Sequence, residues 1–294
     1  YGVKLANLDY EIAVGEAIGN QQSEELKTSV MLRLAIDNHI KRELKLAPLK
    51  IKVLSLFFIN KVADYRLHEN DAASDGWLAK LFVEQLKIVL QSSDGKRYLQ
   101  LCHNSFNLNL ENDLDLAKLH NGYFAKDKKG NYKDSKDDTQ DSVAAYQLIM
   151  RDKELLLDQQ TPLRFIFSHS ALKEGWDNPN VFQVCVLQES SNTFKRRQQV
   201  GRGLRLCVNN FGERIKDDKI NTLTVIAGES YNSFAANLQK EYEESVANGG
   251  AGIKFGYVHP LIFVTQLMKN NPALSSQQSN QLSQDIYEVL KVSQ

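Results

Sequence analysis

A run of cations without any acidic residue lies in the second half of the chain, within residues 190–212. Arginine suits a transferring phosphate because its guanidinium stays charged and offers a planar fork of donors. Arg202 and Arg205 are three residues apart, so a helix would place them on one face. Gly201 and Gly203 leave room for close backbone approach. The segment fits a γ-phosphate site of a nucleotide hydrolase, and it fits a basic surface helix equally well. The cations of the run are Lys195, Arg196, Arg197, Arg202 and Arg205.

A second polar stretch, residues 168–181, directly follows a predicted strand. Loops at the carboxyl ends of parallel strands are where open α/β sheets bind ligands. Hydroxyls such as those of Ser168 and Ser170 can bind a nucleic-acid phosphate, and a carboxylate such as that of Asp177 can bind a ribose hydroxyl. Alternatively, the Asp-Asn-Pro-Asn sequence that begins at Asp177 is only a turn. His169 has no nearby His or Cys in the sequence, which favours a structural role over a metal ligand.

The elements that must position these residues alternate between two patterns. Segments rich in β-branched and aromatic residues predict strands at 51–59, 163–169, 181–187 and 221–227. Helical periodicity predicts helices at 22–46, 76–91, 142–158, 231–246 and 281–292, and residues 195–206 begin with helix formers before the glycines. Such alternation predicts β-α-β units, and therefore a mostly parallel sheet with helices on both faces.

Three segments predict turns or loops. Ser92-Ser93-Asp94-Gly95 has the composition of a turn, and residues 247–256 are a Gly-rich loop. Residues 111–141 are rich in both acidic and basic residues and lose apolar content after Leu119. A solvated loop or an insertion is the simpler interpretation of that segment. A loop that touches nucleic acid is the alternative.

Composition and charge bound the class of protein. The 294 residues contain 36 Lys and Arg and 36 Asp and Glu, so the formal net charge is zero. This excludes a DNA binder that works by bulk positive charge, and any nucleic-acid contact must come from a local patch. The longest apolar stretches are strand-length, far below a membrane span, so no membrane association is expected. The chain begins with Tyr1 rather than Met, which suggests an excised piece of a longer protein.

The cysteines point to a reducing compartment. Cys102, Cys185 and Cys207 form no C-x-x-C pair, so a zinc site built on cysteines is not expected, and no metal site is predicted in this chain. An odd number of cysteines in a chain of this length favours reduced thiols in a cytoplasmic protein.

Two motifs resemble those of superfamily-two helicases. Gln198, Gly201, Arg202 and Arg205 match the Q-x-x-G-R-x-x-R pattern of motif VI, and Gly175 and Asp177 match the G-x-D pattern of motif V. A closer resemblance is carried by residues 165–182, Phe-Ile-Phe-Ser-His-Ser-Ala-Leu-Lys-Glu-Gly-Trp-Asp-Asn-Pro-Asn-Val-Phe. This stretch looks like the Res subunit of type III restriction enzymes. Residues 52–60, 120–124 and 149–154 support it, and the resemblance covers roughly residues 25–245.

The resemblance implies a fold and a division of the chain. The fold would be that of the second RecA-like motor domain, an α/β domain of the P-loop NTPase type that lacks its own P-loop, because the sequence contains no G-x-x-x-x-G-K-[ST] motif. Residues 1–21 would connect to a missing first motor domain, and residues 22–246 would form the second. Residues 91–141 would be partly an insertion, and residues 247–294 would extend toward a missing nuclease domain.

The resemblance also implies roles for individual residues. Arg202 and Arg205 would face the γ-phosphate of ATP as catalytic residues, with Arg205 as the finger. Gln198 and Gly201 would support the nucleotide there, and Gly175 and Asp177 would lie at the nucleotide edge of the cleft between the motor domains. Mg²⁺ and ATP would be held mainly by the missing first motor domain. The residues implied in DNA binding are Ser168, Ser170, Asn60, Lys195, Arg196 and Arg197.

The activity implied is that of an ATP-dependent, site-specific deoxyribonuclease with DNA-dependent ATPase. Its partners would be double-stranded DNA, a modification methyltransferase (Mod) subunit and the missing domains of the same chain. The fragment alone is expected neither to hydrolyse ATP nor to cut DNA. Two alternatives remain open, namely another superfamily-two motor, such as a repair helicase or a type I restriction motor, and a non-enzymatic nucleic-acid-binding module with a motor-like fold.

Overall fold

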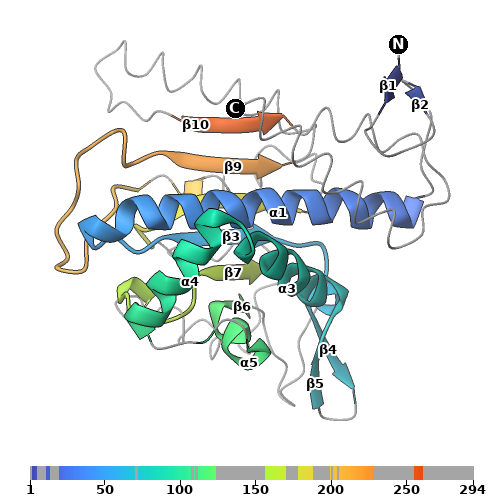
Figure 1. The fold of residues 1–294 in the computed structure, drawn as a ribbon, viewed down its shortest axis with the longest axis horizontal. Coiled ribbons are helices and arrows are strands. Elements are labelled where there is room, and N and C mark those ends of the chain that lie inside the picture. The colour runs from blue at the N-terminus through green and yellow to red at the C-terminus, as the bar shows by residue number, and fades with distance from the viewer. Residues whose placement is uncertain are drawn as a thin grey trace.

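The fold is built on one six-stranded sheet (Figure 1). The computed structural model describes residues 2–4, 11–13, 20–69, 72–106, 109, 112–123, 156–169, 178–187, 199, 201–203, 205–227 and 255–260. The strands, in spatial order, are β10 (Phe255–Pro260), β9 (Leu223–Ala227), β8 (Val181–Val186), β3 (Leu54–Phe58), β7 (Phe165–Ser168) and β6 (His120–Tyr123).

All neighbouring strands of this sheet pair in parallel. The four strands predicted from composition are its four central strands, and β3, β7 and β8 are buried along their whole length. A parallel sheet needs crossover connections and cover on its faces, which is why its strands are almost continuously apolar. The structure confirms the prediction of a RecA-like α/β fold.

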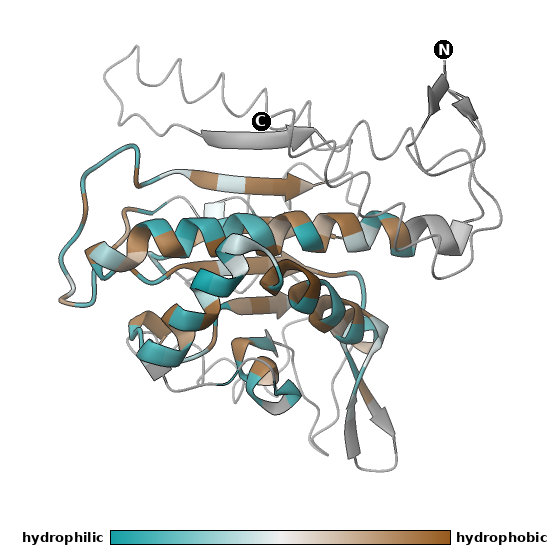
Figure 2. Ribbon diagram, in the orientation of Figure 1, coloured by the Kyte–Doolittle hydropathy of each residue, from teal (hydrophilic) through white to brown (hydrophobic). Residues whose placement is uncertain are grey.

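Helices pack together on one face of the sheet. The long α1 (Asn20–Leu46) runs along the direction of the strands, and α3 (Trp77–Leu90) and α4 (Ser93–Phe106) pack against it and against each other. Figure 2 shows why: α3 is largely apolar, whereas apolar and polar residues alternate along α1. Leu32, Ile36 and Ile40 of α1 are buried, as their four-residue spacing predicts. Short helical segments are α2 (Val62–Tyr65), α5 (Asp113–Leu116), η1 (Ala47–Leu49), η2 (Ala117–Leu119) and η3 (Gly201–Gly203).

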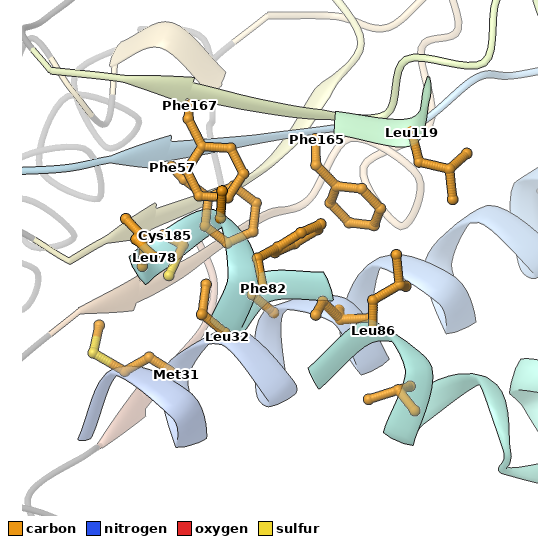
Figure 3. Packing of buried hydrophobic residues seen from close by; sticks show 14 of the residues in the cluster. Met31, Leu32, Phe57, Leu78, Phe82, Leu86, Leu119, Phe165, Phe167 and Cys185 are labelled. Atoms are coloured by element: carbon orange, nitrogen blue, oxygen red, sulfur yellow. The ribbon is translucent and has the colours of Figure 1, made fainter. Parts of the chain in front are cut away.

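The core under these helices is aromatic (Figure 3). Phe57 of β3 and Phe167 of β7 stack with ring centroids 4.7 Å apart. Phe82 of α3 meets Phe57, Phe165 and Phe167 edge-on, at centroid distances of 5.8, 5.1 and 5.2 Å. Offset and edge-to-face pairs of this kind stabilise a core beyond the apolar area they bury. The packing fixes α3 above β3 and β7.

The turn predicted at residues 92–95 is wrong. Helix α4 begins at Ser93, and the Ser92 hydroxyl accepts a hydrogen bond from the Gly95 N–H at 3.0 Å. Ser and Asp favour turns and helix N-termini for the same reason, since their side chains bind nearby backbone N–H groups. Tyr98 and Cys102 of this helix are fully buried, and that burial decides between the two outcomes.

Part of the loop predicted at 111–141 is also regular structure. Leu116 and Leu119 are buried, and β6 pairs with β7 at the edge of the sheet. The two-stranded antiparallel pairs, β1 (Gly2–Lys4) with β2 (Glu11–Ala13) and β4 (Arg66–Glu69) with β5 (Ala72–Asp75), were not predicted either. The domain boundaries remain predictions. Outside the described residues lie the rest of that loop and the predicted helices at 142–158 (apart from residues 156–158), 231–246 and 281–292.

The described part of the chain has no helix that combines the length and apolarity needed to cross a bilayer. Cys102, Cys185 and Cys207 are all buried free thiols, as predicted. Burial raises the pKa of the Cys207 thiol to about 11 and that of Cys102 to about 12.

A buried ion pair ties α1 to the start of β7. The Arg164 Nε donates to Glu43 Oε1 at 2.6 Å, and Tyr98 Oη and His39 Nε2 contact Glu43 Oε2 at 2.9 and 3.0 Å. Burial raises the pKa of Glu43, but Arg164 and these two hydrogen bonds outweigh it and lower that pKa to about 2. Glu43 is therefore ionised at neutral pH, with Arg164 as its charge partner.

Glu43→Gln is expected to destabilise the fold by about 3–5 kcal/mol, because it leaves the Arg164 charge buried and uncompensated. Asp113→Asn is the matched control, since Asp113 pairs with Lys87 at 2.6 Å and both side chains are exposed. That control should cost less than about 1 kcal/mol. Urea unfolding of both variants measures the difference, and equal costs would show that the buried pair adds nothing.

His120 makes stability depend on pH. Its ring is 5% exposed, and its Nδ1 lies 2.7 Å from the Tyr65 hydroxyl. Burial is the main cause that lowers the pKa of His120 to about 4. Between about pH 4 and the unfolded value near 6.5, the unfolded chain therefore binds more protons than the folded one.

The free energy of unfolding is expected to fall as the pH drops from about 6.5 to about 4, by up to about 1.4 kcal/mol per pH unit from this residue. His120→Phe should show a shallower fall, because it removes the titrating group from both states. Urea unfolding at several pH values tests this. Identical slopes in the two proteins would mean that His120 does not titrate as described.

Candidate functional site

The cation run reaches the amino edge of the sheet, where β8 and β9 begin. In η3, a Cβ added to Gly203 would come within 2.2 Å of Cδ1 of Leu223, the first residue of β9. A Cβ added to Gly201 would meet nothing within 4 Å. The two glycines thus differ: a side chain at Gly203 would have to displace Leu223, whereas the space beside Gly201 is open.

The two candidate catalytic arginines have different surroundings. Arg202 is buried, with 9% of its surface exposed. Arg205 is exposed, and none of the described residues forms an ion pair or hydrogen bond with its guanidinium. A phosphate supplied by another domain can reach Arg205 without displacing an internal partner. This accessibility supports the choice of Arg205, rather than Arg202, as the arginine that faces a ligand.

The chain after Arg205 is held on several sides. Cys207 N–H donates to Asn221 Oδ1 at 2.9 Å, and Ile215 N–H donates to the Cys207 carbonyl at 2.9 Å. Val208 forms an antiparallel bridge with Arg214. A small apolar cluster anchors the same place, with the Cys207 side chain packed near Leu46, Ile51, Val53 and Phe182. Arg205 therefore projects from a fixed segment of backbone.

Asn178 and Asn180 complete this edge of the sheet. Asn180 exchanges two 2.9 Å hydrogen bonds with the backbone of Val208, its Nδ2 donating to the carbonyl and its Oδ1 accepting from the N–H. Asn178 Oδ1 accepts the Asn180 N–H at 3.0 Å. The sequence analysis gave these two residues no role of their own, and a turn was one of its alternatives for the segment. Two asparagines flanking a proline directly before a strand are a signal that could have identified them.

Of the residues proposed to bind DNA, Asn60 and Ser168 lie at the opposite, carboxyl edge. β3 and β7 end side by side, where the Ile59 N–H donates to the Ser168 carbonyl at 2.9 Å. Asn60 follows and is exposed, as is Lys61. Ser168 is buried, with 1% of its surface exposed, so a DNA phosphate does not reach its side chain in this structure. At this edge Asn60 and Lys61 are thus exposed, whereas Ser168 is not.

The structure therefore separates the described candidate residues into two groups. Gly201, Arg202 and Arg205 come together at the amino edge, and Asn60 and Ser168 come together at the carboxyl edge. In the described part of the chain, no group of three His, Cys, Asp or Glu residues could hold a metal ion. The candidates outside the described residues are Ser170, Gly175, Asp177, Lys195, Arg196, Arg197 and Gln198.

Gly203→Ala is expected to destabilise the fold by about 1–3 kcal/mol, because the added methyl group must displace the buried Leu223 side chain. Gly201→Ala should leave the free energy of unfolding nearly unchanged, since the space there is open. Urea unfolding of the two variants makes the comparison. Similar values for both would contradict the different packing of the two glycines.

Comparison with known proteins gives the family. No family model matches the chain. The chain is 38% identical over 211 residues to the EcoPI Res subunit of a type III restriction-modification enzyme from Escherichia phage P1, and 37% identical over 211 residues to the EcoP15I Res subunit from Escherichia coli. Each match covers 70% of this chain and 20% of the relative. The StyLTI Res subunit of Salmonella typhimurium is 28% identical over 306 aligned residues, 93% of this chain and 29% of the relative.

These matches agree with the parallel α/β sheet and with the motifs at its edges. The chain spans about a fifth of the length of the first two relatives. Over the part that aligns, it belongs to the family of type III restriction-modification Res subunits.

Proposed function

We propose that this chain is the second motor domain of an ATP-dependent type III restriction enzyme. It would complete the ATP site and part of the DNA-binding surface of a DNA-dependent ATPase that moves along DNA. The fold and the similarity to Res subunits support a helicase-like role in restriction. The motif VI pattern at Gln198, Gly201, Arg202 and Arg205 supports the assignment to the second motor domain.

One observation carries the proposal furthest: Arg205 is exposed at the end of a segment that is otherwise anchored. A cation that stabilises charge on a transferring phosphoryl group must be accessible, yet held in place before the reaction. Arg205 meets both conditions. Arginines in this role accelerate nucleotide hydrolysis by about 10³ to 10⁵ in well-studied cases.

The ATP and Mg²⁺ would be held mainly by a first motor domain that is not part of this chain, and Mg²⁺ would neutralise charge on the phosphates. The residues of this chain fit a contributing role. The open backbone at Gly201 allows close approach of a phosphate, and the neighbouring Arg202 is buried. Gln198, Gly175 and Asp177 would line the same edge of the cleft.

DNA would bind at the carboxyl edge of the sheet. Asn60 lies there as an accessible side chain, with Lys61 beside it. Phosphate contacts from such residues position a protein on DNA without reading its sequence. Ser170 and the basic residues Lys195, Arg196 and Arg197 remain proposed DNA contacts. Since ATP and DNA would lie at opposite edges of one sheet, a shift of this domain on ATP hydrolysis would move its DNA contacts.

The whole protein would be a site-specific deoxyribonuclease that works in the cytoplasm with a Mod subunit and acts on double-stranded DNA. The isolated chain would lack turnover, because the residues that would hold ATP lie elsewhere. The StyLTI, EcoPI and EcoP15I proteins are themselves named as Res subunits of restriction-modification enzymes, which agrees with this assignment.

Arg205→Ala in the full-length parent protein, assembled with its methyltransferase partner, is expected to lower DNA-stimulated ATPase turnover by two or more orders of magnitude. The physical reason is the loss of the charge that faces the γ-phosphate. Turnover at saturating ATP and DNA is the measurement, with DNA binding and thermal unfolding measured in parallel.

Arg97→Ala is the matched control, because Arg97 is an exposed arginine on another element, α4. Its turnover should stay near that of the wild type. Near-normal turnover in Arg205→Ala would refute the finger assignment, and the cation run would then be a DNA-binding or solvated segment.

A further inference from the structure

Asn180 connects three parts of the amino edge through hydrogen bonds that are all buried. Its carbonyl accepts from the Leu54 N–H of β3 at 2.9 Å, and its own N–H is bound by Asn178 Oδ1. Its side-chain amide exchanges two bonds with Val208. Asn180 and Asn178 are 1% and 0% exposed. Because water cannot replace these contacts, each one constrains the backbone.

The reciprocal pair with Val208 has a geometric consequence. One planar amide that binds both the N–H and the carbonyl of a residue acts like a neighbouring strand, and so fixes the orientation as well as the position of that residue. Val208 is three residues from Arg205, and the chain between them includes the anchored Cys207. The Asn180 amide therefore constrains the direction of the backbone between Val208 and Arg205.

Asn180 also lies close in sequence to residues that are proposed to face the nucleotide. Asn178 directly follows Asp177, so the two asparagines adjoin the Gly175–Asp177 segment in sequence. The clasp, meaning the Asn180–Val208 hydrogen-bond pair, joins the start of β8 to the chain that follows Arg205, although its two residues are 28 apart in sequence.

We propose that Asn180 is a positioning residue for Arg205, which it holds in place through the clasp. This inference rests on the proposed function. Asn180 touches no nucleotide; its effect on turnover passes through Arg205. Misplacement of a catalytic group by about 1 Å can cost about 10²-fold in rate.

A double-mutant cycle separates this role from a general effect on folding. The ATPase turnover of the full-length protein with its methyltransferase partner is measured for Asn180→Ala, Arg205→Ala and the double variant. Asn180→Ala alone should lower turnover by about 10- to 100-fold. In the Arg205→Ala background the same change should lower it by less than about twofold, because the group that Asn180 positions is gone.

The matched control is Gln183→Ala. Gln183 is a buried amide on β8 that also makes two hydrogen bonds, to the Ala35 carbonyl and the Ser55 hydroxyl, but neither leads to Arg205. At a temperature where thermal unfolding shows both variants to be folded, Gln183→Ala should keep turnover within about threefold of wild type.

Asn180→Asp supplies a second readout. An aspartate still accepts the Val208 N–H, but only its protonated form can donate to the Val208 carbonyl. Turnover of this variant, relative to wild type at each pH, should therefore rise as the pH falls. Thermal unfolding of this variant at each pH must be measured in parallel, because protonation of a buried aspartate also raises the free energy of unfolding. The recovery counts for the positioning role only where the variant stays folded over the whole pH range.

The outcomes test the proposed function and the positioning role of Asn180 separately. Normal turnover in Arg205→Ala overturns the proposed function, whatever Asn180 does. If Arg205→Ala is slow, the inference fails when Asn180→Ala matches Gln183→Ala or slows the Arg205→Ala protein by the same factor as the wild type. It also fails if the relative turnover of Asn180→Asp is flat with pH.

Discussion

The buried pair of Glu43 and Arg164 is the contact on which the rest of this fold depends. It joins α1 to the residue that precedes β7, while the backbone of Arg164 bonds both to Leu119, before β6, and to Ser55 of β3. A buried charge pair costs desolvation energy, and it is tolerated here because nearly every oxygen and nitrogen around it has a hydrogen-bond partner. Breaking it would release the helix layer and the start of two neighbouring strands together.

The amino edge of the sheet thus carries two kinds of buried polar contact. The ion pair orders the region of β3, β7 and β6, and the Asn180–Val208 clasp orders the region of β8 and β9. Both act where parallel strands begin and where backbone groups would otherwise lack partners. A rigid edge is what an arginine needs if it is to face a ligand supplied by another domain.

Local patterns predicted much of the fold and less of the site. The four central strands and helices α1 and α3 follow from composition and periodicity, because their apolar residues are buried by neighbours on every side. Strands β6 and β10 were missed, since an edge strand pairs on one side only and needs few strand-forming residues. The start of helix α4 was mistaken for a turn, because Ser92 and Asp94 suit both a turn and a helix N-terminus. Ser168 was expected to contact DNA. It is buried beside β3, and the sequence alone does not reveal that pairing.

The sequence by itself determined three properties: which segments form the four central strands, that Arg202 and Arg205 share a cationic run, and that the chain resembles type III Res subunits. These properties are local, because residue type and spacing carry them. Only the tertiary structure decided that Arg205 is exposed while Arg202 is buried, that the candidate residues divide between two edges of the sheet, and that Asn180 holds Val208. Those properties depend on contacts between residues far apart in sequence. Forming such contacts lowers the entropy of the chain, and this loss is compensated only when the whole sheet and its core form together.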